Sequence, residues 1–387
     1  MKILNIYSNW KWTGPVEPVL TLMDFLSRQG HHVTFAYRMP PDETDRNIHA
    51  NIGRFQVIPL TKFRLNHVLK WNNWSSLPGT IHDLRRLPGY LNEEGFDLVQ
   101  VHRSHDHLVG GIAARISRRK PPVIRMDHKR DSLAPSIANR VLVGTFTDGL
   151  ITFSRRSQDL IRRRFAFPED RLVVVNPALD LKRPDFHRSY KDMRPVFGLS
   201  ENVFVLGNVA RFQRYRGTHR LIKAIHLLRE RLPHLRLLLV GRSGEIRESV
   251  EAPIREFGLE DRVILAGYRI DDYFDTLASM DCFVLLTPGS DGTARALREA
   301  MALGLPVIVT RKGMLPELVD DGRAGIVVED TPESLSEAIF QMVTDKERRR
   351  KLAAAAKTYA LEAFQLDRQA ERVVNFYEEI VKRHKKA

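Results

Sequence analysis

The chain has 387 residues, 43% of them hydrophobic and 28% charged, which is typical of soluble globular proteins. A chain of this length is expected to form two domains, and no apolar run approaches the ~20 residues that a membrane-spanning helix needs. The formal net charge is +14, and residues 1–190 carry 29 basic against 18 acidic side chains, whereas the remainder carries 32 against 29. This excess favours an anionic partner, either an acidic membrane surface or nucleic acid, unless it serves solubility alone.

The N-terminal residues 1–7 read as a first strand and lack the long apolar region of a secretion signal. The single cysteine, Cys282, excludes an intramolecular disulfide and lies in an apolar run. We interpret Cys282 as a small core side chain of a protein in a reducing compartment, in preference to a nucleophile. We therefore expect a cytoplasmic protein.

Strands and helices alternate through the first half, which is the pattern of a parallel, doubly wound α/β sheet. An amphipathic helix is expected over residues 16–28, ending at Gly30. Apolar runs predict strands at residues 3–7, 33–37, 55–60, 98–101, 123–126, 149–153 and 172–175.

Residues 67–90 interleave Trp and Leu with basic side chains that include Arg85 and Arg86. This composition suits the headgroup region of a bilayer or the mouth of a site for a lipid-linked acceptor. Two ordinary surface helices that pack their apolar faces on the sheet explain it slightly better.

A polar, proline-flanked segment separates the two halves, and we place a linker at residues 186–195. It would join a domain of residues 1–185 to one of residues 196–364, with residues 365–387 as a final helix. The second half again alternates, with strands at 204–206, 236–240, 263–265, 282–286, 307–309 and 325–328 and helices at 332–343, 345–364 and 367–382.

Residues 282–310 predict a strand, a glycine-containing loop and a helix that begins at Thr293 and stops at Gly304. A helix N-terminus at the carboxyl end of a parallel strand binds anions, because unpaired backbone N–H groups and the helix dipole point at the ligand. Two carboxylates, Asp291 and Glu299, bracket the loop. Carboxylates beside a phosphate-binding loop are better explained as acceptors for sugar hydroxyls than as partners of phosphate.

Three arginines, Arg211, Arg214 and Arg216, follow the first strand of the second half. Guanidinium groups there would clamp a diphosphate and neutralise charge on a departing nucleotide, although the loop alone could be a solvated basic turn. Short glycine turns at residues 240–244 and 266–270 follow neighbouring strands and would line the same crevice.

In the first half, His102 stands where a strand ends. It could hydrogen-bond a sugar hydroxyl or lie beside the reacting carbon, and a capping or packed histidine is the alternative. A metal site that adds His105 and His107 is disfavoured, because these two start a helix and no Cys or acidic partner completes the set. The next strand end offers a similar group: Arg125, Asp127 and His128.

Several motifs are absent from the sequence: a Walker phosphate loop, a Gly-x-Gly-x-x-Gly turn after the first strand, a Gly-x-Ser-x-Gly elbow and an Asp-x-Asp pair at a strand end. A group transfer from an activated nucleotide donor, without metal or cofactor, fits the remaining motifs best.

The motifs of residues 206–330, in their order, resemble those of retaining nucleotide-sugar glycosyltransferases of the GT-B fold, family 4. They include Gly207-Asn-Val-Ala-Arg-Phe212, Asp291 with Glu299-Ala-Met-Ala-Leu-Gly-Leu-Pro306, and Leu315-Pro-Glu-Leu-Val-Asp-Asp-Gly322. The resemblance continues more faintly through the first half. It implies two Rossmann-like domains facing across a cleft, with the final helix crossing back to the first.

The resemblance also implies roles for residues. Arg211 and Arg216 would bind the donor diphosphate, although the family usually has Lys at the second position. Glu299 would bind the ribose hydroxyls. Asp291, where the family usually has Glu, would bind the donor sugar. His102 would lie at the reacting face, so the implied catalytic residues are His102, Arg211, Arg216 and Asp291. The remaining donor-side residues are Gly14, Gly207, Gly241, Tyr268, Gly292, Thr293 and Ala294, and the acceptor side would comprise Trp12, Thr13, Arg125, Asp127 and His128.

The implied activity is retaining transfer of a sugar from a nucleotide diphosphate to a glycan or lipid-linked acceptor, in bacterial cell-surface polysaccharide or lipopolysaccharide synthesis. The protein would be cytoplasmic or peripheral at the inner face of the plasma membrane. A nucleotide-sugar epimerase of the same fold is the alternative. A nucleic-acid-binding protein is less well supported, because no helix-turn-helix, zinc or stacking-aromatic motif is present.

Overall fold

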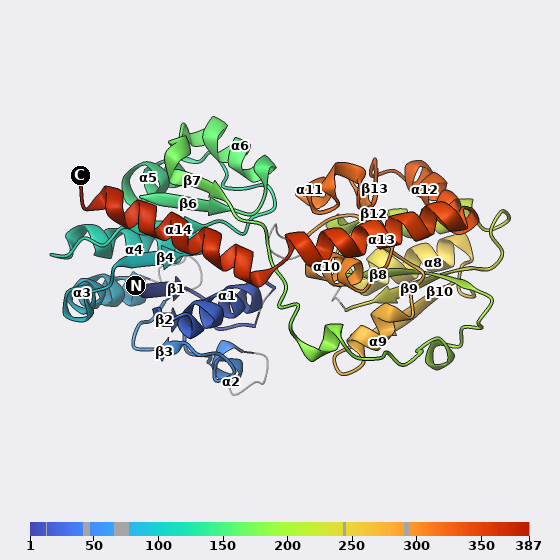
Figure 1. The fold of residues 1–387 in the computed structure, drawn as a ribbon, viewed down its shortest axis with the longest axis horizontal. Coiled ribbons are helices and arrows are strands. Elements are labelled where there is room, and N and C mark those ends of the chain that lie inside the picture. The colour runs from blue at the N-terminus through green and yellow to red at the C-terminus, as the bar shows by residue number, and fades with distance from the viewer. Residues whose placement is uncertain (13, 42–46, 66–76, 243–244, 290–293, 387) are drawn as a thin grey trace. The chain divides into compact units, whose positions relative to one another are not determined.

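The computed structural model describes residues 1–12, 14–41, 47–65, 77–242, 245–289 and 294–386 (Figure 1). By its internal contacts the chain divides into two units. The first contains Met1–Ala178 and the final helix, and the second contains residues 179–289 and 294–365. Each unit is described below by itself.

The first unit is built on a parallel sheet whose described strands follow the order β3-β2-β1-β4-β5-β6-β7. After β1 the chain moves outward to β3 and then returns to form β4 on the other side of β1. The gap between the carboxyl ends of β1 and β4 is therefore the topological switch point, where such sheets bind ligands. The strands are β1 (Lys2–Tyr7), β2 (His32–Tyr37), β3 (Ile58–Leu60), β4 (Leu98–Val101), β5 (Val123–Met126), β6 (Gly149–Thr152) and β7 (Leu172–Val174).

Helices cover both faces of this sheet, because alternate residues of each strand point to opposite faces. In β1, Leu4 and Ile6 join the core cluster that includes α3 and α4, whereas the Asn5 side chain contacts Met23 of α1. The helices of this unit are α1 (Val16–Arg28), α2 (Ile48–Ile52), α3 (Leu77–Glu94), α4 (Ser104–Ile116), α5 (Ile137–Phe146), α6 (Arg155–Phe165) and α14 (Leu366–His384).

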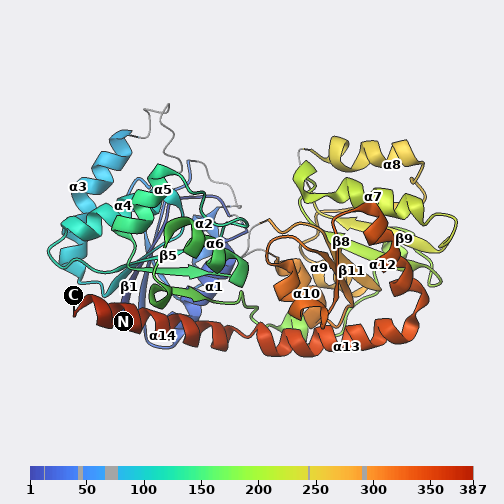
Figure 2. The ribbon, with the colours of Figure 1, turned by 90° about the horizontal axis from the view of Figure 1, so that it is seen from above.

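The C-terminal helix α14 packs beside α1 on the first unit (Figures 1 and 2). A Cβ atom on Gly149 would lie 2.9 Å from Ile380 Cγ1 and 3.0 Å from Phe376 Cζ, so glycine at the start of β6 makes room for the helix. The buried Tyr377 hydroxyl donates to Gln100 in β4. The segment expected to return to the first domain is thus anchored there by apolar packing and a buried hydrogen bond.

The second unit has a parallel sheet in the order β10-β9-β8-β11-β12-β13, with its switch point between β8 and β11. Its strands are β8 (Phe204–Val209), β9 (Leu235–Val240), β10 (Val263–Gly267), β11 (Cys282–Leu285), β12 (Val307–Thr310) and β13 (Ile326–Val328). Its helices are α7 (Thr218–Leu227), α8 (Ala252–Phe257), α9 (Tyr273–Ala278), α10 (Arg295–Ala302), α11 (Leu315–Leu318), α12 (Pro332–Thr344) and α13 (Lys346–Ala363). The prediction of two Rossmann-like doubly wound sheets is confirmed.

The first half and the link between the units differ from the sequence-based expectations in the following details. The strand expected at residues 55–60 is shortened to Ile58–Leu60. The segment 186–195, expected to be a linker after residue 185, is fixed to the second unit, and the division by contacts falls after Ala178. Its charged side chains hold it there, because Arg188 pairs with Asp275 at 2.7 Å and Arg194 with Asp281 at 2.9 Å.

Candidate active site

At the switch point of the second unit, Arg216 links the loops that follow β8 and β11. Its Nη1 donates to the Thr287 carbonyl oxygen at 2.7 Å. The residue ends a short 3-10 turn, and Gly217 then adopts a left-handed conformation (φ 82°) before α7 begins. A cation from one strand end is therefore held against the loop of the neighbouring strand.

Arg211, at the same strand end, is exposed, and its guanidinium makes no hydrogen bond or ion pair with any described residue. It is thus available to an anionic ligand. Charged hydrogen bonds to phosphate oxygens are about twice as strong as neutral ones, and arginine supplies them in a fork that fits phosphate.

Glu299 lies in α10 and is only 2% exposed. Its Oε2 accepts from the Tyr273 hydroxyl at 2.7 Å, and its Oε1 accepts from Arg295 Nε at 2.6 Å. Burial, followed by the charge of Glu299, raises the pKa of Tyr273 well above its ordinary value, so the hydroxyl keeps its proton and donates. The carboxylate is held in one orientation, with lone pairs left for further donors.

Two predicted glycines of this unit are required by space. A Cβ atom on Gly207 would lie 1.8 Å from Met280 Sδ, and one on Gly241 would lie 1.9 Å from the Ala210 carbonyl oxygen. Gly241 also has φ 149°, which other residues rarely adopt. Gly207 makes room for the Met280 side chain and Gly241 for the Ala210 backbone, so packing accounts for both without a ligand.

The other predicted donor-side residues fall into two sets. Tyr268 is 54% exposed with the Arg242 guanidinium 4.4 Å from its ring centroid, Ala294 is buried before α10, and Gly14 is exposed before α1. Asp291, Gly292 and Thr293 lie outside the described residues, as does Thr13 on the acceptor side.

In the first unit the switch point holds a buried polar cluster. His102 follows β4, and its Nε2 lies 2.5 Å from Asn5 Oδ1 while its Nδ1 lies 3.0 Å from His128 Nε2. Both ring nitrogens of His102 are thus used inside the protein, and the ring is only 2% exposed. His128, which follows β5, lies next to it.

Two carboxylates and one guanidinium surround these rings. Asp106 accepts from the backbone N–H of His102 at 3.1 Å and of Arg103 at 2.7 Å, and burial raises its pKa to about 6. Arg125 is 1% exposed and lies 3.6 Å from Asp127, which also accepts from the Ser132 hydroxyl. Burial, followed by the nearby positive charges, lowers the pKa of His128 to about 3, so the ring is neutral at physiological pH.

The remaining first-unit residues lie apart from one another. Trp12 stacks on Phe55 with ring centroids 6.3 Å apart. His105 and His107 lie in the first turn of α4, as expected, and His107 Nε2 contacts the Thr147 hydroxyl at 2.8 Å. Among the described residues, no three His, Cys, Asp or Glu side chains are gathered in a way that could hold a metal ion.

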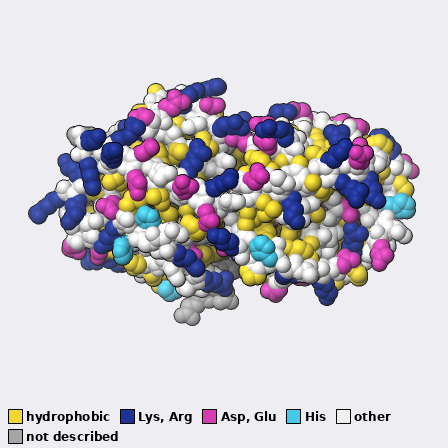
Figure 3. All heavy atoms as spheres, viewed as in Figure 1, with side chains coloured by type: hydrophobic (Ala, Val, Ile, Leu, Met, Phe, Trp, Pro, Cys, Tyr) yellow, Lys and Arg dark blue, Asp and Glu magenta, His cyan; other side chains and the backbone are white. Residues whose placement is uncertain are grey.

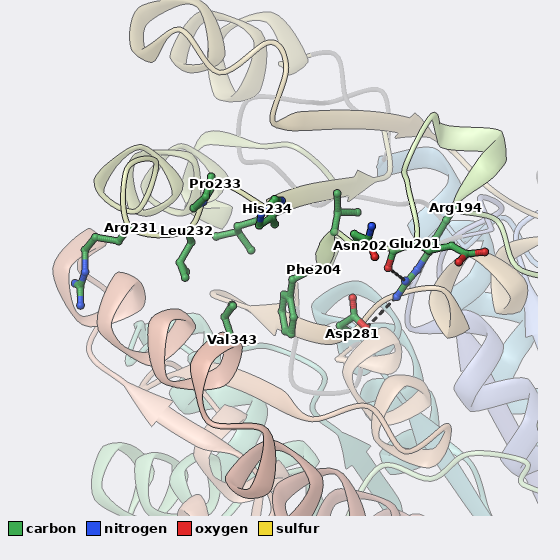
Figure 4. A pocket seen from close by; sticks show the side chains of 12 residues that line it. Arg194, Glu201, Asn202, Phe204, Arg231, Leu232, Pro233, His234, Asp281 and Val343 are labelled. Carbon is green, nitrogen blue, oxygen red and sulfur yellow. Dashed lines mark hydrogen bonds and ion pairs between the residues drawn. The ribbon is translucent and has the colours of Figure 1, made fainter.

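A cavity of about 410 Å³ lies elsewhere, at the amino ends of β8, β9 and β11 (Figure 4). Arg194 and Asp281 on its wall pair with each other, and Asp281 also accepts from the Val205 backbone N–H at 2.7 Å. These charges are therefore satisfied within the protein, and apolar side chains such as Phe204 form much of the lining. The cavity lies at the amino ends of the strands, whereas Arg216 lies at their carboxyl ends.

Sequence reasoning missed three side chains of these sites: Tyr273, Arg295 and Asn5. Arg295 lies four residues before Glu299, and that helical spacing could have indicated the ion pair. No local signal identifies Tyr273, 26 residues before its partner, or Asn5, 97 residues before His102.

No helix in the described part of the chain is both long and apolar enough to cross a membrane.

Comparison with known proteins agrees with this architecture. HepE of Anabaena, solved in complex with UDP and glucose, superposes with a TM-score of 0.75 at 20% identity, covering 97% of this chain and 98% of that one. The N-acetyl-alpha-D-glucosaminyl L-malate synthase of Bacillus anthracis is 25% identical over 82% of this chain and 86% of that protein. A GDP-mannose-dependent phosphatidylinositol monomannoside mannosyltransferase of Mycolicibacterium smegmatis is 27% identical over 67% and 70%.

Family models match both halves. Residues 14–183 match Glycosyltransferase Family 4, and residues 189–359 match Glycosyl transferases group 1. Together the two matches span most of both units. The chain is therefore a group 1 glycosyltransferase of family 4 with the GT-B fold.

Proposed function

We propose that this glycosyltransferase moves a sugar from a nucleotide diphosphate to an acceptor hydroxyl with retention of anomeric configuration. The observation that carries the proposal is the second-unit switch point, where Arg216 is fixed against the loop after β11 and Glu299 is held by Tyr273 and Arg295. A cation for the diphosphate and a carboxylate for hydroxyls are the groups that a nucleotide sugar needs. The UDP bound to HepE supports a donor of this class.

In the proposed complex, Arg211 and Arg216 bind the diphosphate, and Glu299 accepts from the ribose hydroxyls. Asp291 accepts from the donor sugar, and the backbone N–H groups that begin α10 contribute to phosphate binding. Because both arginines stay charged at any physiological pH, they stabilise the negative charge that grows on the diphosphate as it leaves. We propose that this replaces a metal ion, so that transfer needs no metal or cofactor.

The proposed transfer occurs on one face of the sugar. The acceptor oxygen forms a bond to the anomeric carbon as the bond from that carbon to the diphosphate oxygen breaks. The diphosphate leaves with the electron pair of the broken bond and takes up the proton of the acceptor hydroxyl. The neutral, buried His102 and His128 shape the acceptor side and do not take the proton.

The acceptor that we propose is a glycan or a lipid-linked molecule used in building a bacterial cell surface, as in polysaccharide or lipopolysaccharide synthesis. Figure 3 shows Lys and Arg side chains gathered at the end of the first unit where α14 ends. The exposed basic residues at this end include Arg118, Arg119, Lys120, Lys382, Arg383, Lys385 and Lys386. This charge, with the lipid named for the mycobacterial relative, supports a peripheral position on the inner face of the plasma membrane.

Thermal unfolding with uridine, guanosine and adenosine diphosphates and their sugars tests the donor class. A ligand at 100 times its Kd stabilises a protein by about 2.7 kcal/mol, which raises the melting temperature measurably. We expect one nucleotide series to stabilise the protein equally with and without EDTA. No stabilisation by any series would contradict the proposal, and stabilisation that EDTA abolishes would contradict metal independence.

A further inference from the structure

Three basic side chains surround the carboxyl ends of β4 and β5 in the first unit. Arg103 is the N-cap of α4 and follows His102, Arg125 lies in β5, and Lys129 follows His128. His102 Nδ1 and His128 Nε2 are 3.0 Å apart, so the residues that follow these two histidines are brought close together as well. Neither Arg103 nor Lys129 has a role in the transfer described above.

The turn that carries Lys129 is fixed by hydrogen bonds. The Ser132 backbone N–H donates to the Lys129 carbonyl oxygen at 3.2 Å, and the Ser132 hydroxyl donates to Asp127 at 3.0 Å. Arg164 of α6 donates to the Asp131 carbonyl oxygen at 2.7 Å. The backbone of Lys129 is therefore held in one place beside the strand end.

The Lys129 ammonium has no partner in the described part of the chain. It is exposed to solvent and makes no hydrogen bond or ion pair with any described residue. Enough protein surrounds it that desolvation, followed by the charge of Arg125, lowers the pKa of Lys129 from its ordinary value, while Asp127 opposes the change. An anion bound beside the ammonium would favour its charged form and raise the pKa again.

Arg125 adds a positive charge beneath the surface. It is 1% exposed, and its Nε and Nη1 make no hydrogen bond with any described residue. Its ion pair with Asp127 is long, with 3.6 Å between Nη2 and Oδ1. Arg125 lies too deep to touch a ligand at the surface, but its charge acts on Lys129 through a poorly hydrated region, where electrostatic interactions are stronger than in water.

The carboxylates of this region are used by the protein itself. Asp106 accepts from the backbone N–H of His102 and of Arg103, and Asp127 accepts from a serine hydroxyl as described above. Both carboxylates are buried, whereas Lys129 reaches solvent. The surface beside the ends of β4 and β5 therefore presents positive charge that no described acidic side chain pairs with at Lys129.

We propose that the acceptor is an anion, and that Lys129, with Arg103 beside it, binds a phosphate or carboxylate group of that acceptor. A neutral glycan would leave the ammonium unpaired and would not interact with the charge of Arg125. Naming the ligand as the acceptor rests on the proposed function. The anion site itself rests on the charges and contacts of the first unit. The phosphate of a lipid-linked sugar, the phosphate of a soluble sugar and the carboxylate of an acidic sugar share this chemistry.

NMR spectra of the full chain with ¹³C-methylated lysines test the site without donor or turnover, and Lys129→Arg assigns the Lys129 signal. The probes are glycerol 3-phosphate, glycerate and neutral glycerol. With at least one of the two anions we expect saturable movement of the Lys129 signal and a higher Lys129 pKa, and with glycerol we expect neither. Lys351, exposed on α13 and paired with Glu347, is the internal control for ionic strength. No saturable movement with either anion, or equal movement at Lys351, would overturn the site.

Calorimetric titration with the anion that moves the Lys129 signal measures the contribution of the ammonium. Lys129→Gln should weaken binding at least about 10-fold, because a hydrogen bond to a charged group is lost. Lys129→Arg keeps the charge and should retain most of the affinity, and Lys351→Gln should bind as the wild type does. Equal affinity in Lys129→Gln and the wild type would refute the role of Lys129.

A lipid-borne phosphate is distinguished from a soluble one with dihexanoyl phosphatidic acid. Tighter binding than that of glycerol 3-phosphate would identify a lipid-linked acceptor, and equal or weaker binding would identify a soluble anion. Displacement of the bound probe by a nucleoside diphosphate would place the anion on the donor and overturn the proposal. If nucleotides stabilise the protein but neither anion binds at Lys129, the anionic acceptor is refuted while the proposed function stands.

Discussion

Replacing Glu299 with glutamine should weaken nucleotide diphosphate binding about 10- to 150-fold. Arg295 Nε lies 2.6 Å from Oε1, and this donor fixes the new amide with its oxygen toward Arg295. The NH₂ group then faces Tyr273 and the ligand, where it cannot accept from ribose. At least one hydrogen bond to a charged group is lost, worth about 1.5–3 kcal/mol, and each 1.4 kcal/mol is a factor of ten.

Calorimetric titration with the best-binding nucleoside diphosphate and its 2′-deoxy form measures this loss. The wild-type protein should prefer the ribose form, and Glu299→Gln should lose much of that preference. Tyr273→Phe is the companion variant, because it keeps the carboxylate and removes only the hydroxyl that orients it, so its loss should be smaller. Unchanged ribose discrimination in Glu299→Gln would refute the assignment of Glu299 to ribose.

Three further predictions concern turnover, pH and membranes. Arg211→Ala should lower kcat about 100- to 1000-fold in a nucleotide-release assay, because a hydrogen-bond donor that stabilises transition-state charge is lost. The control Arg229→Ala, at an exposed residue paired with Glu230, should leave kcat unchanged. Near-normal turnover of Arg211→Ala would contradict its role. Between pH 7 and pH 5 the buried, neutral His128 should lower the free energy of unfolding by about 2 kcal/mol, because His128 binds a proton below about pH 6.5 in the unfolded chain but not in the folded one. Asp106, which is protonated in the folded protein below about pH 6, should offset about 1 kcal/mol of this loss. Urea titrations should therefore show a shallower pH dependence for His128→Gln, and equal slopes would count against a neutral ring. Anionic vesicles should sediment the protein, and Arg85→Glu with Arg86→Glu should reduce that binding; sedimentation that is equal on neutral vesicles would exclude an electrostatic contact.

The sequence was sufficient for features that depend on local periodicity and on the order of strands. Alternation of strands and helices predicted both sheets, and the expected strand at residues 98–101 placed His102 at a strand end. Sequence was not sufficient to show how His102 is used, because its partners Asn5 and His128 are 97 and 26 residues away. The end of a predicted strand indicates where a residue lies in the sheet, whereas the hydrogen bonds of its side chain depend on packing between distant segments.

The same limit explains the misplaced linker. Arg188 and Arg194 stand in a polar, proline-flanked segment, and their partners, Asp275 and Asp281, come more than 80 residues later. Charge patterning in a sequence does not show which residues are paired in space. The resemblance in motif order did identify the family, because it uses many positions at once.

Retaining transfer from a nucleotide diphosphate sugar can be followed by time-resolved ¹H NMR of donor hydrolysis. Water replaces the acceptor, and α-linked UDP-glucose, UDP-N-acetylglucosamine and GDP-mannose are supplied in turn. We predict that one donor releases its nucleoside diphosphate together with the α-anomer of the free sugar before mutarotation. First appearance of the β-anomer, or no release from any donor, would contradict retaining transfer by this protein.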